Sequence, residues 1–246
     1  MVIILSFLVL HWYASAFAQS FFLHRYTSHR QFTMNSFWEK FFYLFTFFAQ
    51  GSSFLHPKSY ALLHLQHHTH SDTEEDPHSP HYFTDVMQMM LNTRKIYMEY
   101  RRGERTGPNA FADSMPTWDF IDRLGNSSFT RVGFVLLYTW FYFQFAPSIW
   151  WFLLLPVHAA MGPLHGAFIN WCGHKYGYRN FDMADESRNT FLFDLFFVGE
   201  CFQNNHHKYP KRANFAVKWF EFDPVYPVMK LLNFSRIIRL KADPIR

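Results

Sequence analysis

The stretch Val132–His174, "VGFVLLYTWFYFQFAPSIWWFLLLPVHAAMGPLHGAFINWCGH", contains no Asp, Glu, Lys or Arg over 43 residues. As a helix rising about 1.5 Å per residue it would extend roughly 65 Å, about twice the ~30 Å hydrocarbon core of a bilayer. The turn sequence Ala146-Pro147-Ser148 lies near the middle of its apolar part. We therefore predict two membrane spans here, at residues 129–145 and 149–169.

A second charge-free stretch, residues 1–24, begins the chain. Residues 2–22 have roughly the ~20-residue length that a third span requires. All 23 Lys and Arg and all 19 Asp and Glu lie in residues 25–131 and 175–246. Three spans with Met1 on the far side place both charged segments on one face, and their basic residues predict that this face is cytoplasmic.

These observations predict an all-α integral membrane protein, with about three transmembrane helices, interfacial helices and a cytoplasmic helical lobe. A cleaved signal peptide is the alternative for the first stretch, although no basic segment precedes it. Two shorter apolar segments, residues 41–55 and 191–202, are predicted as interfacial or buried helices. Residues 100–118 are the one clear soluble loop that the sequence predicts.

Composition excludes some classes of protein. Two cysteines, Cys172 and Cys201, provide no disulfide framework and fit a reducing compartment. The net charge of +4 is too small to indicate a nucleic-acid partner. Fifteen histidines are the unusual feature of the composition.

Four short motifs contain most of the chemistry that the histidines offer. They are "HRYTSH" (His24, His29), "HLQHH" (His64, His67, His68), "NWCGH" (Asn170, His174) and "QNNHH" (Gln203, His206, His207). On a helix, positions i, i+3 and i+4 share a face, so all three imidazoles of "HLQHH" can point at one centre. Adjacent histidines, joined to a third group one turn back, also let one helix approach two metals.

The remaining histidines have plainer interpretations. We read His11, His56, His158 and His165 as polar residues with ordinary hydrogen bonds. The segment "THSDTEEDPHSPH", which contains His70, His78 and His81, reads as a solvated acidic loop.

The eight motif histidines are predicted at one membrane face and indicate a metal centre. A zinc ion takes about four protein ligands, so eight imidazoles indicate two metals. Imidazole binds iron, copper, nickel and zinc, so the ligand type does not identify the metal. A site sealed against a membrane suits chemistry on a lipid chain, where two irons could activate dioxygen and attack an unactivated methylene.

The motifs resemble those of the membrane fatty acid desaturases, specifically the acyl-CoA (stearoyl-CoA, delta-9 type) group. That family has the boxes HxxxxH, HxxHH and [HQ]xxHH, and an asparagine four residues before another histidine. The flanking stretches "DPHSP", "HKYGYRNFD" and "GECFQNNHHKYP" match as well. The resemblance extends from the first box to about Asp223 and makes residues 1–246 a single desaturase domain, with histidine-box regions at 24–128 and 170–246.

The resemblance implies a di-iron centre that uses dioxygen to insert a cis double bond into a saturated acyl chain, without a separate catalytic acid or base. The ligands it implies are His24, His29, His64, His67, His68, His174, His206 and His207. It implies that Asn170 reaches one metal through a water. Many stearoyl-CoA enzymes have a ninth histidine at the position of Gln203, for which we favour a water-mediated role. The family's extra span before the first box is missing here or lies before the start of this chain.

Partners and location follow from the same resemblance. The substrate is expected to be a long-chain acyl group in the bilayer, most simply as acyl-CoA, because excess Lys and Arg suit an anionic carrier. No GxGxxG or HPGG motif occurs, so electrons are expected from ferredoxin or a b-type cytochrome with its reductase. The membrane is expected to be the bacterial inner membrane or the endoplasmic reticulum.

Two alternatives stay open at this point. A membrane hydroxylase with the same boxes would leave oxygen on the acyl chain. A zinc-dependent membrane hydrolase or metal-handling protein would perform no redox chemistry.

Overall fold

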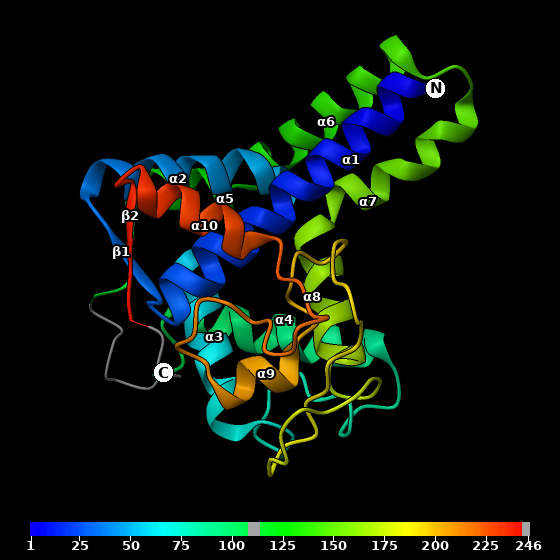
Figure 1. The fold of residues 1–246 in the computed structure, drawn as a ribbon. Coiled ribbons are helices and arrows are strands. Elements are labelled where there is room, and N and C mark those ends of the chain that lie inside the picture. The colour runs from blue at the N-terminus through cyan, green and yellow to red at the C-terminus, as the bar shows by residue number, and fades with distance from the viewer. Residues whose placement is uncertain (108–113, 243–246) are drawn as a thin grey trace.

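The computed structural model describes residues 1–107 and 114–242, and these residues form a mostly helical protein (Figure 1). Helix α1 (Val2–Phe17) continues directly into the π-helix η1 (Ala18–Ser28). Together they make one apolar helix of 27 residues, Val2–Ser28, which is long enough to cross a membrane. The helix that contains the predicted span at 2–22 continues for six more residues, to Ser28.

The second apolar region begins with helix α6 (Ser128–Phe145), which matches the predicted span at 129–145 as a helix. Arg131 lies inside its first turn and donates to the carbonyl oxygens of Gly125, Ser52 and Phe54 at 2.8–3.0 Å. These bonds satisfy the guanidinium at the edge of the apolar stretch.

The predicted span at 149–169 is not one straight helix. It consists of the short 3-10 helix η4 (Ile149–Leu154), α7 (Leu155–Ala159) and α8 (Met161–Cys172). The chain bends by 68° between the segments Ile149–Ala159 and Met161–Cys172. Ala160 leaves the helical region at φ −128°, ψ 21°, and Pro163 cannot donate a backbone hydrogen bond across the break. Among the described residues, only the helix Val2–Ser28 is by itself long and apolar enough to cross a membrane. The bent pair would be a second such segment if its two parts are counted as one span.

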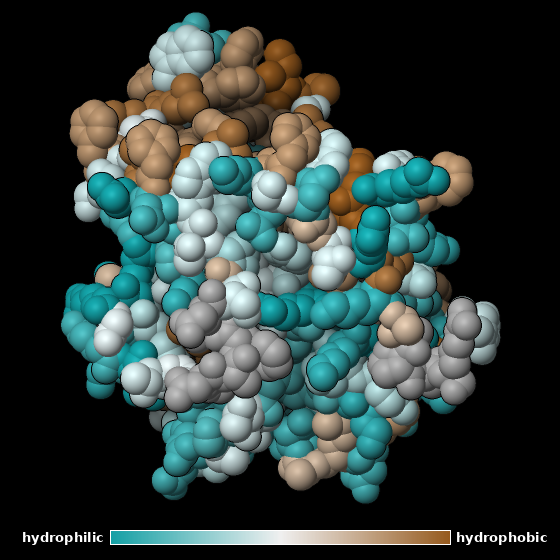
Figure 2. All heavy atoms as spheres, turned by 90° about the vertical axis from the view of Figure 1, so that its left-hand side faces the viewer, coloured by the Kyte–Doolittle hydropathy of each residue, from teal (hydrophilic) through white to brown (hydrophobic). Residues whose placement is uncertain are grey.

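Helices α1, α6 and α7 form an arm that projects from the rest of the molecule, with the N-terminus near its tip (Figure 1). Apolar side chains gather at that end of the molecular surface, whereas hydrophilic residues cover the opposite end (Figure 2). This segregation is the pattern expected of a protein with one end in lipid.

Below the arm, capped helices carry the polar part of the molecule. The amphipathic helix α2 (Ser36–Gln50) begins where Asn35 accepts the backbone N–H of Trp38 at 3.0 Å. Helix α3 (Pro57–His70) begins at His56, which accepts the backbone N–H of Ser59 at 3.1 Å. Helix α4 (Val86–Arg102) begins at Asp85 and ends at Gly103, whose φ of 73° suits glycine. The predicted loop at 100–118 starts three residues too early, because residues 100–102 still belong to α4, and its residues 108–113 lie outside the described residues.

The remaining elements are short. They are the 3-10 helix η2 (Gly51–Ser53), helices α5 (Asp119–Asn126), α9 (Gln203–Lys208) and α10 (Val225–Phe234), and strands β1 (Phe32–Met34) and β2 (Ile238–Leu240). The two strands pair antiparallel, with Thr33 opposite Arg239. The main hydrophobic core lies between η1, α2 and α10, and Phe21, Phe22 and Met229 are fully buried in it.

The segment 191–202 is not the helix that the sequence predicts but a series of turns. Both carboxylate oxygens of the buried Asp194 accept backbone N–H groups, from Phe197 at 2.9 Å and Cys201 at 2.8 Å. Val198 and Gly199 adopt positive φ values of 53° and 90°, which end any regular helix. The compact turn places Glu200 beside the first histidine motif.

Candidate metal centre

The structure brings the eight motif histidines together in two groups. The five-histidine group contains His24, His29, His64, His68 and His206, and the three-histidine group contains His67, His174 and His207. Within each group, the atoms that could bind a metal lie within 4.8 Å of one another. "HLQHH" on α3 therefore does not point at one centre. Its first and third histidines face one group and His67 faces the other.

The Nε2 atoms of the five-histidine group converge. The Nε2–Nε2 distances are 2.9 Å for His24–His206, 2.7 Å for His29–His64, 3.0 Å for His64–His68 and 2.9 Å for His68–His206. Two imidazole nitrogens held about 2.0–2.1 Å from one ion lie roughly 3 Å apart. The convergence fits one metal ion among these side chains.

The π-helix η1 explains how the widely spaced His24 and His29 meet in that group. Five positions along an ordinary α-helix would place two side chains about 140° apart around the axis. At the end of η1 the backbone N–H of His29 donates to the carbonyl oxygen of His24 at 3.1 Å. This bond spans five residues, so one turn of the π-helix brings the two residues to the same side. The rings consequently approach to 4.9 Å between centroids.

The three-histidine group joins residues from three parts of the chain. The Nε2 atoms of His67 and His207 lie 3.2 Å apart. Ring centroids are 4.9 Å apart for His67–His174 and 5.0 Å for both other pairs. His174 lies just beyond the end of α8 and not on the helix that its spacing from Asn170 predicts. Its buried Nε2 has no hydrogen-bond partner among the described residues, which suits an atom that binds a metal.

Four of the eight histidines have a carboxylate against Nδ1. Glu200 contacts His24 at 2.5 Å, and the other three pairs are Asp76–His67 at 2.9 Å, Asp72–His174 at 2.7 Å and Asp185–His207 at 3.1 Å. A partner on one ring nitrogen fixes the tautomer and turns the other nitrogen toward a metal. Sequence reasoning missed these carboxylates, because such pairs join distant residues and no local spacing marks them.

Burial keeps most imidazoles of the five-histidine group neutral. It lowers the pKa values of His29, His64, His68 and His206 well below the ordinary 6.5, and proximity to neighbouring histidines lowers them further. Burial also acts to raise the pKa of Glu200, but His24 and Arg25 outweigh it and bring the value to about 2. Neutral imidazole is the protonation state that metal binding requires.

Arg25 anchors this arrangement from inside the protein. Its fully buried guanidinium donates to Glu200 at 3.1 Å and to Asp223 at 2.7 Å and lies 3.9 Å above the ring of Phe215. A buried carboxylate needs such a partner, since an uncompensated charge would be expensive. Arg25 therefore holds in place the residue that orients His24.

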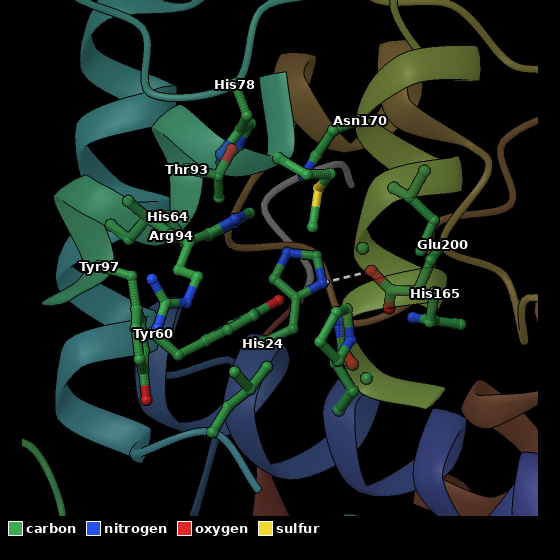
Figure 3. Close-up of a pocket in the computed structure, with 18 of the residues that line it drawn as sticks. His24, Tyr60, His64, His78, Thr93, Arg94, Tyr97, His165, Asn170 and Glu200 are labelled. Carbon is green, nitrogen blue, oxygen red and sulfur yellow. Dashed lines mark hydrogen bonds and ion pairs between the residues drawn. The ribbon is translucent and has the colours of Figure 1, made fainter. Parts of the chain in front are cut away.

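A cavity of about 140 Å³ lies beside the five-histidine group. Residues of η1, α3, α4 and α8 line it, together with Glu200 and Gln203 (Figure 3). His24 and His64 lie on its wall among apolar side chains such as Leu63 and Ile169. An apolar cavity that ends at a cluster of metal-binding side chains suits a hydrocarbon substrate.

Asn170 and Gln203 both line this cavity. The Nε2 of Gln203 donates to the carbonyl of Glu200 at 2.7 Å, within its own turn. Its Cγ also packs closely against Gly173, the residue before His174. The structure therefore places Gln203 near the three-histidine group.

The histidines outside the motifs divide into two kinds. His11 and His158 bond each other through Nδ1 at 2.7 Å, and His56 caps α3, so the prediction of ordinary hydrogen bonding is confirmed for these three. It is wrong for His165, whose nitrogens are buried without a hydrogen-bond partner among the described residues.

The solvated-loop prediction fits His70, whose side chain is 38% exposed, but fails for His78, which is 4% exposed. Residues 76–80 of this loop are buried, and Asp76 and Asp72 bond His67 and His174 of the three-histidine group.

Comparison with known proteins gives a consistent result. The family described as "Fatty acid desaturase" matches residues 1–232. A protein of Anemone leveillei named acyl-CoA 5-desaturase AL21 is 28% identical over 92% of this chain and 68% of its own length. The sn-1 stearoyl-lipid 9-desaturase of Anabaena variabilis is 25% identical over 92% of this chain and 79% of its own. Delta-9 acyl-lipid desaturase 1 of Arabidopsis thaliana is 28% identical over 89% and 68%.

Proposed function

Because the chain belongs to the fatty acid desaturase family, and is therefore an oxidoreductase acting on acyl chains, we propose that it is a di-iron membrane desaturase. The reaction converts –CH2–CH2– in a saturated acyl chain into cis –CH=CH–. Dioxygen, two electrons and two protons enter, and two waters leave. The observation that supports this proposal best is the pair of adjoining histidine groups, one of which opens onto an apolar cavity.

The residues present fit two metal ions. Buried imidazoles converge in both groups, and carboxylates orient four of the eight. Two bound irons would supply the redox chemistry that activates dioxygen, which no side chain acting as acid or base could perform. In this proposal the five-histidine group holds one ion and the three-histidine group holds the other, while Asn170 and Gln203 orient water beside the smaller group.

The cavity positions the substrate. Its apolar wall excludes water from the acyl chain, and His24 and His64 bring the metal-binding groups to its surface. Arg94 lines the cavity from α4 and could face an anionic acyl carrier. Relatives named for acyl-CoA and for acyl-lipid substrates both match the chain. We propose acyl-CoA and a delta-9 product.

The membrane arrangement follows from the apolar arm. We propose that residues 2–22, residues 129–145 and the bent segment at 149–169 lie in the bilayer and that the histidine groups face the cytoplasm. Electrons would come from an external carrier, ferredoxin or a b-type cytochrome with its reductase.

Reconstitution tests this function. The purified chain, loaded with iron and given saturated acyl-CoA, a carrier, a reductase and ¹⁸O₂, should yield an olefin two hydrogens lighter than the substrate and free of ¹⁸O. A product containing ¹⁸O would support a hydroxylase, and iron binding without consumption of dioxygen would refute redox chemistry.

A further inference from the structure

His78 is a buried imidazole without a hydrogen-bond partner. Its residue is 4% exposed, and neither ring nitrogen bonds any residue in the described part of the chain. Polar groups buried in this way cost free energy, so nearly all of them in native proteins have a partner. The side chain lines the cavity, on the side where Asn170 lies (Figure 3). Something other than these protein groups must satisfy this ring.

The backbone holds His78 firmly at this position. Its N–H donates to Asp76 Oδ1 at 2.9 Å. The carbonyl of the preceding Pro77 accepts from Asn92 at 3.0 Å and from Thr93 at 3.2 Å, both on α4. These hydrogen bonds fix the backbone that carries the His78 ring.

The same segment organises the three-histidine group. Asp76 bonds His67, and Asp72 bonds His174 while accepting from Ser79 at 2.6 Å. His78 lies two residues after Asp76 in the chain and next to His67 in space. Its ring centroid is 4.4 Å from that of His67, compared with 4.9–5.0 Å between members of the group. The atoms of His78, His67 and Asp76 that could bind a metal lie within 4.8 Å of one another, so His78 adjoins the three-histidine group through His67.

The three-histidine group also lacks a ligand. The other group offers five imidazoles, whereas this one offers three. The amide of Gln203 donates to a backbone carbonyl of its own turn, and a neutral amide is a poorer ligand for iron than imidazole. An ion held by three side chains has at least one open position.

We propose that His78 is the fourth imidazole ligand of the metal held by His67, His174 and His207. This inference rests on the proposed function, because it assumes that the group holds a metal. Asp76 stays against Nδ1 of His67 and orients it, while His78 offers a ring nitrogen that the protein otherwise leaves unpaired.

Metal content tests this assignment without relying on activity. The detergent-purified full chain is loaded with iron, exposed to a chelator and analysed for iron per chain. Wild type should retain about two irons and His78→Ala about one, because the five-histidine group is intact. His70→Ala is the matched control, since it removes an exposed histidine from the same segment and should retain both. Circular dichroism and gel filtration verify that each variant is folded.

A rescue experiment separates a missing ligand from a damaged fold. In the His78→Ala background, Gln203→His supplies another imidazole beside His174 and should restore the second iron. If folded His78→Ala retains both irons as long as wild type does, or if its loss is not restored by Gln203→His, the assignment of His78 is wrong while the di-iron proposal stands. If wild type itself binds no transition metal, the proposed function fails and this inference fails with it.

Discussion

His68 contacts two members of the five-histidine group, with Nε2–Nε2 distances of 3.0 Å to His64 and 2.9 Å to His206. We predict that His68→Ala removes about one iron per chain and abolishes desaturation, because a bound ion loses an imidazole that helix α3 held in place. The variant should still insert into the membrane. Iron analysis and turnover of the purified variant provide the measurement, and full iron with retained turnover would show that His68 is not a ligand.

The carboxylates against Nδ1 make a separate prediction. Asp72→Asn weakens the contact that orients His174, and such partners typically contribute about 10–100-fold in metal affinity or activity. We therefore expect faster loss of the iron at the three-histidine group under a chelator. Glu74→Gln is the control, because Glu74 is an exposed acidic residue two positions away. Equal iron retention in the two variants would mean that Asp72 has no orienting role.

At the residue scale, the sequence predicted the eight histidines as metal ligands, but it did not predict the carboxylates that contact them. The spacing of "HLQHH" and "QNNHH" is a local pattern on a helix, so it can be read without a structure. Glu200 meets His24 across 176 positions and Asp72 meets His174 across 102. Only the folded chain reveals those pairs, and for the same reason the acidic segment containing His78 read as a solvated loop.

Gly166 of helix α8 forms part of the cavity wall. A Cβ at Gly166 would meet only Gln19, at 3.6 Å, so a small side chain fits and a larger one must enter the cavity. We predict that Gly166→Leu reduces turnover of long acyl chains roughly tenfold or more, since overpacking costs about 1–3 kcal/mol. Iron content should stay unchanged.

The control for that substitution is Gly133→Leu on α6. A Cβ at Gly133 meets nothing within 4 Å, and this residue does not line the cavity. Product profiles over a series of acyl chain lengths provide the measurement. Identical profiles for the two variants would show that α8 does not limit the substrate.

Element by element, the sequence predicted helices better than their irregularities. Charge-free stretches indicated α1 and α6, and the spacing of "HLQHH" indicated α3, because these features are local. The π-helix at Ala18–Ser28, the 68° bend before α8 and the turns around Asp194 interrupt apolar stretches whose composition does not mark them. Two of these irregularities also position residues of the metal centre. The π-helix pairs His24 with His29, and the turns carry Glu200 to His24.

The whole molecule has an apolar arm at one end and the histidine groups away from it. Met1 lies near the tip of the arm, beside the turn that joins α6 to η4 (Figure 1). We predict that cysteines placed at residues 147 and 70 in membrane vesicles are labelled from opposite sides, because no charged residue lies near position 147. A cysteine-free background removes labelling at Cys172 and Cys201. Labelling of both positions from the same side would overturn this orientation.

Electron supply is also a property of the whole chain. We expect the iron-loaded protein to form no product with acyl-CoA and dioxygen alone beyond one turnover, since two electrons must enter in each cycle. Adding ferredoxin or a b-type cytochrome with its reductase should start continuous turnover. Continuous product formation without any carrier would contradict the need for an external donor.

The central claim is that the two histidine groups hold two irons, which desaturate an acyl chain bound in the cavity. Fatty-acid profiling of a host that makes this protein tests it most directly, with the His68→Ala variant at equal membrane abundance as the control. We predict a new cis-monounsaturated fatty acid in cells with the wild-type chain and none in cells with the variant. Hydroxylated fatty acids in its place, or an unchanged profile from an inserted protein that carries two irons and has a working electron donor, would contradict the claim.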